Sequence, residues 1–158
     1  MIEELYLAGG CLWGVQEFFR HIPGVLSTEA GRANGRTGSL EGPYDDYVEC
    51  VKINFESKIM GVGQLVCHLF EIIDPYSKNK QGPDVGRRYR TGVYSKNTSH
   101  LKEAKIFIQN RMDRKKITLE IFPIHNYIKS NEIHQFRLMK NPNEFCHIPK
   151  DILYKYKK

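Results

Sequence analysis

The chain has 158 residues and a mass of 18.4 kDa, the size of a single domain spanning residues 1–158. Hydrophobic residues make up 41% and charged residues 27%, which excludes intrinsic disorder and a coiled coil. No apolar run approaches the ~20 residues of a membrane span, and Glu3 and Glu4 interrupt the region where a signal peptide would lie. We expect a cytoplasmic protein, monomeric and without membrane contact.

The net charge is +6 and there are four cysteines. The positive surplus is typical of a solvated helix end and tail rather than of a nucleic-acid site, because much of it comes from a few clustered residues: Arg111, Arg114, Lys115, Lys116, Lys155, Lys157 and Lys158. The cysteines are neither in CxxC spacing nor in a zinc-site pattern with histidine. We therefore expect no metal and no bound cofactor, and each cysteine is either a small buried residue or a reactive thiol.

Hydrophobic periodicity predicts the elements in chain order. They are strand 4–8, helix 11–22, strand 25–30, a glycine-rich loop 31–42, strand 47–55, helix 62–73, an irregular loop 76–88, strand 89–94, helix 101–112, strand 117–122, a short helix 133–139 and an irregular tail. This order indicates an α+β two-layer sandwich with a ferredoxin-like split βαβ core, extended by one helix and one strand. Because that fold hosts RNA binders, phosphatases and redox enzymes alike, function depends on individual residues.

The first such residue is Cys11, which follows Gly9 and Gly10 where a strand enters a helix. Free backbone N–H groups and the positive end of the helix dipole stabilise a thiolate there, so we expect the pKa of Cys11 to lie below the usual ~8.5. A cysteine that merely caps the helix is the alternative.

Trp13 and Glu49 are the next candidates. Trp13 lies off the apolar stripe of its helix, where it either walls a small apolar pocket near Cys11 or packs under a loop. Glu49 shares a strand face with Val51 and Ile53. A carboxyl group desolvated there has a raised pKa and suits general acid catalysis, whereas one turned to water does not.

The remaining cysteines differ in their surroundings. Cys50 and Cys67 are expected to be packing or incidental thiols, and His134 to be structural. Cys146 lies in an irregular tail between Pro142 and Pro149, where a mobile segment would let its sulfur reach a distant partner. A plain surface thiol is the alternative.

Several motifs along the chain occur in the same order as in a known family. They are Gly-Gly-Cys-Leu-Trp-Gly at 9–14, Pro-Gly-Val at 23–25, Glu49, Ile-Ile-Asp-Pro at 72–75, Asp84-x-Gly86-x-x-Tyr89-Arg90, Ile-Phe-Pro at 121–123, His134-Gln135, and Lys-Asn-Pro at 140–142 before Cys146. Together they resemble the A-type peptide methionine sulfoxide reductases, of which this chain looks like a shortened member.

The resemblance implies a reaction and a donor. The cysteine matching Cys11 attacks the sulfur of a methionine S-sulfoxide, free or in a protein, while the glutamate matching Glu49 protonates the oxygen. The resulting sulfenic acid condenses with Cys146 to a disulfide, which thioredoxin reduces. By the same resemblance Leu12, Trp13, Asp84 and Tyr89 bind the substrate.

Several residues depart from the family pattern. Leu12 replaces a phenylalanine, Tyr47 a histidine, and Arg32 a tyrosine that helps to bind the sulfoxide oxygen, a role for which Tyr44 is the substitute we consider. A second, recycling cysteine is missing after Cys146. Because of these departures, a family member that binds oxidised methionine without turnover is an alternative interpretation. An RNA-binding module of the RRM type is a further alternative, although residues 89–94 lack its RNP1 aromatics.

Overall fold

A six-stranded sheet is the frame of the molecule, and the computed structural model describes all residues 1–158. Its strand order is β7-β6-β1-β3-β2-β8. The strands are β1 (Ile2–Gly9), β2 (Val25–Ala33), β3 (Val48–Glu56), β6 (Thr91–Ser95), β7 (Glu120–Pro123) and β8 (Ile128–Lys129). The inner four are antiparallel in the order of the split βαβ core, whereas β7 joins parallel to β6. The predicted ferredoxin-like class is confirmed.

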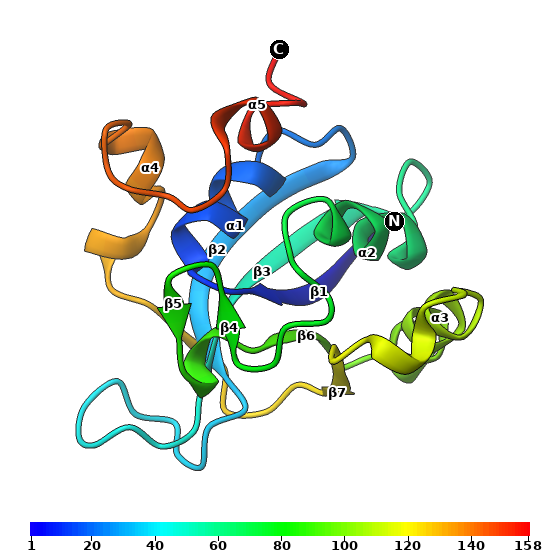
Figure 1. Ribbon diagram of the computed structural model, residues 1–158, viewed down its shortest axis with the longest axis horizontal. Helices are drawn as coiled ribbons and strands as arrows, with labels where there is room; N and C mark the ends of the chain where they lie inside the picture. Colours follow the sequence, from blue (N-terminus) through cyan, green and yellow to red (C-terminus); the bar gives the residue numbers. More distant parts are fainter.

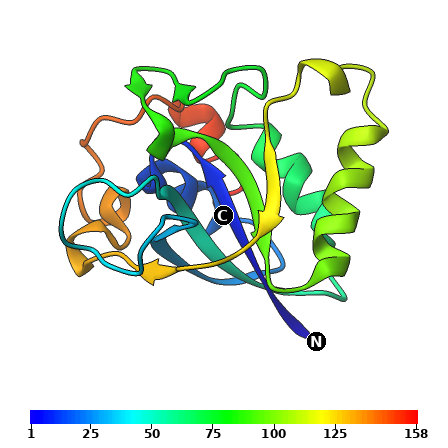
Figure 2. The ribbon, with the colours of Figure 1, turned by 90° about the horizontal axis from the view of Figure 1, so that it is seen from below.

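Helices complete the second layer. α1 (Leu12–Phe19) and α2 (Val62–Phe70) cover one face of the sheet, and α3 (Thr98–Gln109) packs beside α2 (Figures 1 and 2). The C-terminal segment adds the short helices α4 (Arg137–Lys140) and α5 (Lys150–Leu153), both of which contact α1. No helix is long and apolar enough to cross a membrane.

The two faces of the sheet bury unequal cores. The helix-covered face holds a cluster of 23 buried residues, among them Phe18, Ile53 and Leu65. The opposite face holds only six, including Cys50 and Tyr94, and the loop residues Ile124 and Tyr127 pack against them. Each of the four inner strands, β6, β1, β3 and β2, therefore has side chains buried on both sides, because successive residues alternate between the faces.

Where the structure departs from the predicted boundaries, tertiary pairing is the reason. β2 continues to Ala33 because Arg32 and Ala33 pair with β3, so the glycine-rich loop starts later than expected. The segment 76–88 is not wholly irregular, since β4 (Lys80–Gln81) and β5 (Asp84–Val85) form a small hairpin. Two-residue strands such as these and β8 are too short for periodicity to reveal.

Short 3-10 turns account for the other differences. η1 (Arg87–Tyr89) precedes β6, and η2 (Arg114–Lys116) lies between α3 and β7, which begins at Glu120 rather than at 117. η3 (Glu132–His134) takes the place expected for the start of α4. Asn97, whose side chain accepts a hydrogen bond from Ser99 N at 2.9 Å, caps α3 earlier than predicted.

The polar side of α1 is buried, which the sequence does not suggest. Gln16 is 0% exposed, and its side chain bonds to the C-terminal segment. Its Oε1 accepts from Phe136 N at 2.8 Å, and its Nε2 donates to Gln135 Oε1 at 3.4 Å. α1 thus packs between the sheet and the C-terminal segment.

Candidate active site

The turn between β1 and α1 requires its glycines. Gly10 has φ +90, and a Cβ there would lie 2.8 Å from Cβ of Gln81. A Cβ on Gly9 would lie 3.0 Å from Leu69. The backbone therefore passes close to both α2 and β4 before α1 begins. This close approach brings Cys11 to the N-terminus of α1, as the sequence predicts.

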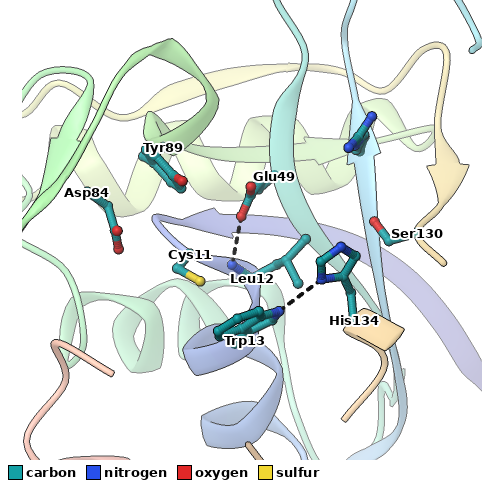
Figure 3. A pocket seen from close by; sticks show the side chains of 9 residues that line it. Cys11, Leu12, Trp13, Glu49, Asp84, Tyr89, Ser130 and His134 are labelled. Atoms are coloured by element: carbon teal, nitrogen blue, oxygen red, sulfur yellow. Dashed lines mark hydrogen bonds between the residues drawn. The ribbon is translucent and has the colours of Figure 1, made fainter. Parts of the chain in front are cut away.

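Cys11 opens into a pocket of about 320 Å³. Glu49, Asp84 and Tyr89 are arranged around the Cys11 sulfur, with Trp13 and Leu12 on the side of α1 (Figure 3). The complete lining is Cys11, Leu12, Trp13, Arg32, Glu49, Asp84, Tyr89, Ser130 and His134. Five separate parts of the fold contribute to it: the start of α1, β2, β3, the β5–η1 segment and the β8–η3 segment.

Glu49 is the second residue of β3, where it pairs with Arg32 of β2. Its Oε1 accepts a hydrogen bond from Leu12 N at 3.2 Å, one of the free amides of the first turn of α1 (Figure 3). Burial raises the pKa of the Glu49 carboxyl, and the Leu12 hydrogen bond opposes that rise. The side chain is thus kept closer to its protonated, proton-donating form than an exposed glutamate.

The pKa of Cys11 runs against the sequence prediction. Burial, followed by the charge of Glu49, raises it to about 12. The expected helix-terminus effect is present, since the backbone N–H of Trp13 hydrogen-bonds to the sulfur and lowers the pKa, but it is the smaller influence. The predicted lowering is wrong because desolvation of the sulfur outweighs the helix terminus.

Trp13 is held by hydrogen bonding and by a cation. Its Nε1 donates to Nδ1 of His134 at 3.2 Å (Figure 3). The Arg137 guanidinium lies 5.1 Å from the centre of the indole. Burial lowers the pKa of His134, as do the nearby charges of Arg32 and Arg137, which keeps the ring neutral and able to accept. His134 is thus a pocket residue rather than a purely structural one.

Gln135 fixes the segment that carries Ser130 and His134. Its Oε1 accepts from Ala30 N at 2.9 Å, while its Nε2 donates to Ala30 O at 2.8 Å and to Ser130 O at 3.0 Å. The amide therefore extends the edge of β2 like a further strand residue. This pairing holds the C-terminal segment against the pocket.

Cys146 lies in a second pocket of about 160 Å³ that adjoins the first. The two share Cys11, Trp13 and Asp84. A Cβ on Gly14 would lie only 3.0 Å from the Cys146 sulfur, so the tail packs directly on the first turn of α1.

The tail around Cys146 is docked rather than loose. Ile148 is 3% exposed and belongs to the main core, and Nδ1 of His147 lies 3.5 Å from Asp84 Oδ2. The sequence prediction of a mobile tail reaching a distant partner is therefore wrong in this respect. The fold already brings both cysteines to one place.

The structure excludes one predicted pocket residue and adds others. Tyr44 is 41% exposed, donates its hydroxyl hydrogen to Tyr47 O at 2.7 Å, and lies outside the Cys11 pocket. It therefore does not replace the tyrosine whose position Arg32 occupies. Arg32 itself lines the pocket. Ser130 was missed because no local pattern marks a residue that reaches the site only through the pairing of β8 with β2.

The other two cysteines lie apart from this site. Cys50 is buried in the smaller core cluster, and Cys67 is exposed on α2. No group of three or more His, Cys, Asp or Glu side chains is arranged to hold a metal ion.

A partly buried thiol beside a carboxyl group with a raised pKa, with a second thiol in the adjoining pocket, is an arrangement suited to thiol-dependent redox chemistry. Comparison with known proteins identifies the class further. The family model described as peptide methionine sulfoxide reductase matches residues 3–157. The chain belongs to this family, whose members are oxidoreductases acting on sulfur, and it is an enzyme of thiol-dependent methionine sulfoxide reduction.

Individual relatives agree with this assignment. A peptide methionine sulfoxide reductase MsrA of Clostridium perfringens is 45% identical over 161 residues, covering 95% of this chain and 100% of the relative. One from Clostridium acetobutylicum is 40% identical, covering 98% and 100%. Among solved structures, reduced Mxr1 from Saccharomyces cerevisiae superposes with a TM-score of 0.85 at 28% identity, covering 92% of this chain and 88% of that one.

Proposed function

We propose that Cys11 is the nucleophile, Glu49 the general acid and Cys146 the resolving thiol in reduction of methionine S-sulfoxide to methionine. The observation that carries this proposal is the shared boundary of the two pockets, which both contain Cys11 while one contains Glu49 and the other Cys146. Cys50 and Cys67 line neither of these pockets.

In the first step the sulfoxide oxygen ends on the enzyme. Glu49 donates its proton to the oxygen as the Cys11 sulfur attacks the substrate sulfur, and the thiol proton returns to the carboxylate. The attack forms an S–S bond between Cys11 and the substrate. The hydroxyl then passes to the Cys11 sulfur as the substrate S–O bond and this S–S bond break, so methionine leaves and Cys11 is left as a sulfenic acid. Thiol plus sulfoxide thus give sulfenic acid plus thioether, with no net change in protons.

The high pKa of Cys11 fits this exchange. A neutral sulfoxide is a weak electrophile, and a general acid supplies the missing polarisation, an effect of ~10²–10⁴-fold. Burial raises the pKa of Cys11 to about 12, so the thiol is protonated before substrate enters, and burial also raises the pKa of Glu49, which favours its protonated form. The proton that Glu49 gives away is replaced by the one that Cys11 must lose.

In the second step the Cys146 thiol attacks the sulfenic sulfur, forming a Cys11–Cys146 disulfide and releasing water. A dithiol donor then reduces the disulfide and leaves as its own disulfide. We propose a thioredoxin for this role. Yeast Mxr1, which this chain resembles, has been solved in complex with Trx2.

Trp13 and Leu12 are proposed to hold the methyl group of the substrate. Both line the Cys11 pocket from the first turn of α1, and their apolar surfaces also exclude water from Glu49. Asp84 and Tyr89 are proposed to bind the polar part of the substrate from the opposite wall. Protein repair under oxidative stress follows from this chemistry. The monomeric state, the absence of a nucleic-acid partner and the cytoplasmic location stay predictions.

A single-turnover assay tests the proposal. Reduced protein is mixed with a peptide containing methionine S-sulfoxide, without a recycling reductant, and thiols are counted while the disulfide is mapped. We expect two thiols lost per methionine formed and a Cys11–Cys146 bond. If no methionine forms, the chain binds oxidised methionine without turnover, and the proposed reaction is wrong.

A further inference from the structure

Arg32 forms part of the wall between the catalytic pocket and a polar pocket of about 180 Å³. The polar pocket is lined on one side by the loop 39–45 and on the other by Tyr47 and Arg88. Substrate held at Cys11 therefore has a second polar cavity directly beside it. None of the proposed catalytic steps uses this cavity.

Two arginines at this cavity lack a carboxylate partner. Their neighbours in the same region are paired, Arg90 with Glu120 at 2.8 Å and Arg87 with Asp46. Arg32 and Arg88 form no ion pair, and the one hydrogen bond of Arg32 goes to the Leu40 carbonyl at 3.3 Å. A guanidinium group has five N–H donors in a planar fork, so most of this donor capacity is free.

Aromatic rings hold both guanidinium groups in place of carboxylates. The Arg32 Cζ lies 4.3 Å from the centre of the Tyr47 ring, and the Arg88 Cζ lies 5.6 Å from the same ring and 5.1 Å from that of Tyr44. Tyr47 is buried, and Tyr44 packs edge-on against it at 4.8 Å. The two charges are thus positioned before any ligand arrives, which lowers the entropy lost on binding.

Two acidic residues line this cavity, and neither forms an ion pair with Arg32 or Arg88. Asp45 Oδ2 accepts hydrogen bonds from Thr37 N at 3.0 Å and Thr37 Oγ1 at 2.6 Å, whereas its Oδ1 is buried without a hydrogen-bond partner. Glu41 is exposed. Burial raises the pKa of Glu49, while Arg88 and Arg32 oppose the rise, which shows that both charges lie within reach of the catalytic acid.

We propose that Arg32 and Arg88 form a subsite for a carboxylate of the substrate, so that this enzyme prefers methionine sulfoxide with a carboxylate beside it. This inference rests on the proposed function. The carboxylate comes either from an acidic side chain next to the oxidised residue or from the α-carboxylate of a free or C-terminal methionine sulfoxide. A bound carboxylate also offsets the two positive charges and so favours the protonated Glu49.

The test compares peptides that differ only beside the sulfoxide. Acetylated, amidated tripeptides carry methionine S-sulfoxide with Ala, Asp or Lys on either side, and N-acetyl-methionine S-sulfoxide is compared with its N-methylamide. Single-turnover rates at subsaturating substrate are measured for the wild type, Arg32→Gln, Arg88→Gln and Arg114→Gln. Arg114→Gln is the matched control, because this exposed residue lies in η2, away from both pockets.

For the wild type we expect the carboxylate-bearing substrate to react roughly tenfold faster than its lysine or neutral counterpart, an advantage that shrinks with added salt. The ratio should approach one in Arg32→Gln and Arg88→Gln and stay unchanged in Arg114→Gln. Because each ratio is taken within one variant, a general loss of activity cancels. Preference among the tripeptides identifies a side-chain carboxylate, and preference for the N-acetyl acid identifies the α-carboxylate.

Two results would overturn the subsite. One is a wild-type ratio near one, and the other is a preference that persists in both pocket variants. The neutral Ala peptide separates this failure from that of the proposed function: if the wild type reduces it, only the subsite is wrong. If no peptide is reduced, the proposed function fails and the subsite with it.

Discussion

The two cysteines of the site are held in opposite ways. Cys11 lies at the junction of β1 and α1, where strand pairing and a buried helix fix the backbone on both sides. Cys146 lies in a segment without regular structure, fixed by the burial of Ile148 and by the packing of its own sulfur on Gly14. One sulfur is positioned by regular secondary structure, the other by the contacts of an irregular segment.

This difference matches the two steps that we propose. The nucleophile must meet Glu49 and the substrate in one geometry, and regular structure provides the required precision. The resolving thiol must approach the Cys11 sulfur after the substrate has reacted, and a packed but irregular segment can shift with few hydrogen bonds to break. The comparison therefore predicts that changes near Cys11 affect the first step and changes near Cys146 the second.

The largest effects are expected when each sulfur is replaced. Cys11→Ser should abolish methionine formation, because a serine hydroxyl does not reduce a sulfoxide. Cys146→Ser should still form about one methionine per enzyme but should not cycle with thioredoxin. Methionine is measured in single-turnover and steady-state assays. Normal cycling of Cys146→Ser would mean that Cys50 or Cys67 resolves the sulfenic acid.

Glu49→Gln is expected to have the next largest effect, slowing the first step by ~10²–10⁴-fold. The reactive form of Glu49 is protonated and its pKa is raised, so the wild-type rate should fall as the pH rises through that pKa. The amide does not titrate, so the variant should lose this fall. Rapid-mixing measurements of methionine formation against pH check both points. An unchanged rate would remove the general-acid role.

Gly14→Ala is expected to have the smallest effect of the three and to act on the second step. A Cβ there would lie 2.8 Å from the Ile148 Cδ1 and 3.0 Å from the Cys146 sulfur, so the tail must shift. We expect disulfide formation to slow by about tenfold, the scale of a mild overpacking strain, while methionine formation changes little.

Gly63→Ala is the matched control for that substitution. Gly63 also lies in the first turn of a helix, and a Cβ there would meet nothing within 4 Å. Both rates should stay at wild-type values in this variant. Equal disulfide rates in the two variants would show that the packing of the tail on Gly14 does not position Cys146.

Most of the secondary structure, and the meeting of Cys11, Trp13 and Glu49 in one pocket, could be predicted from local patterns. The glycine pair before Cys11 marks a strand-to-helix turn, and alternation along β3 assigns Glu49 to a buried face. Tyr44 and Ser130 could not be assigned in this way. Whether Tyr44 reaches the pocket depends on how the loop 34–47 folds, and whether Ser130 does depends on the pairing of β8 with β2, which joins residues far apart in the chain.

The sequence by itself determined the family, the order of elements and the candidates for the reactive groups, because motif spacing and hydrophobic periodicity are local properties. Only the tertiary structure decided how strongly those groups are perturbed and which distant residues join them. The pKa of Cys11 is raised because burial depends on the whole fold, whereas the helix terminus that would lower it is local. The same holds for Arg32. In the sequence it is only a departure from the family pattern, whereas in the fold it lines both the Cys11 pocket and the neighbouring polar cavity.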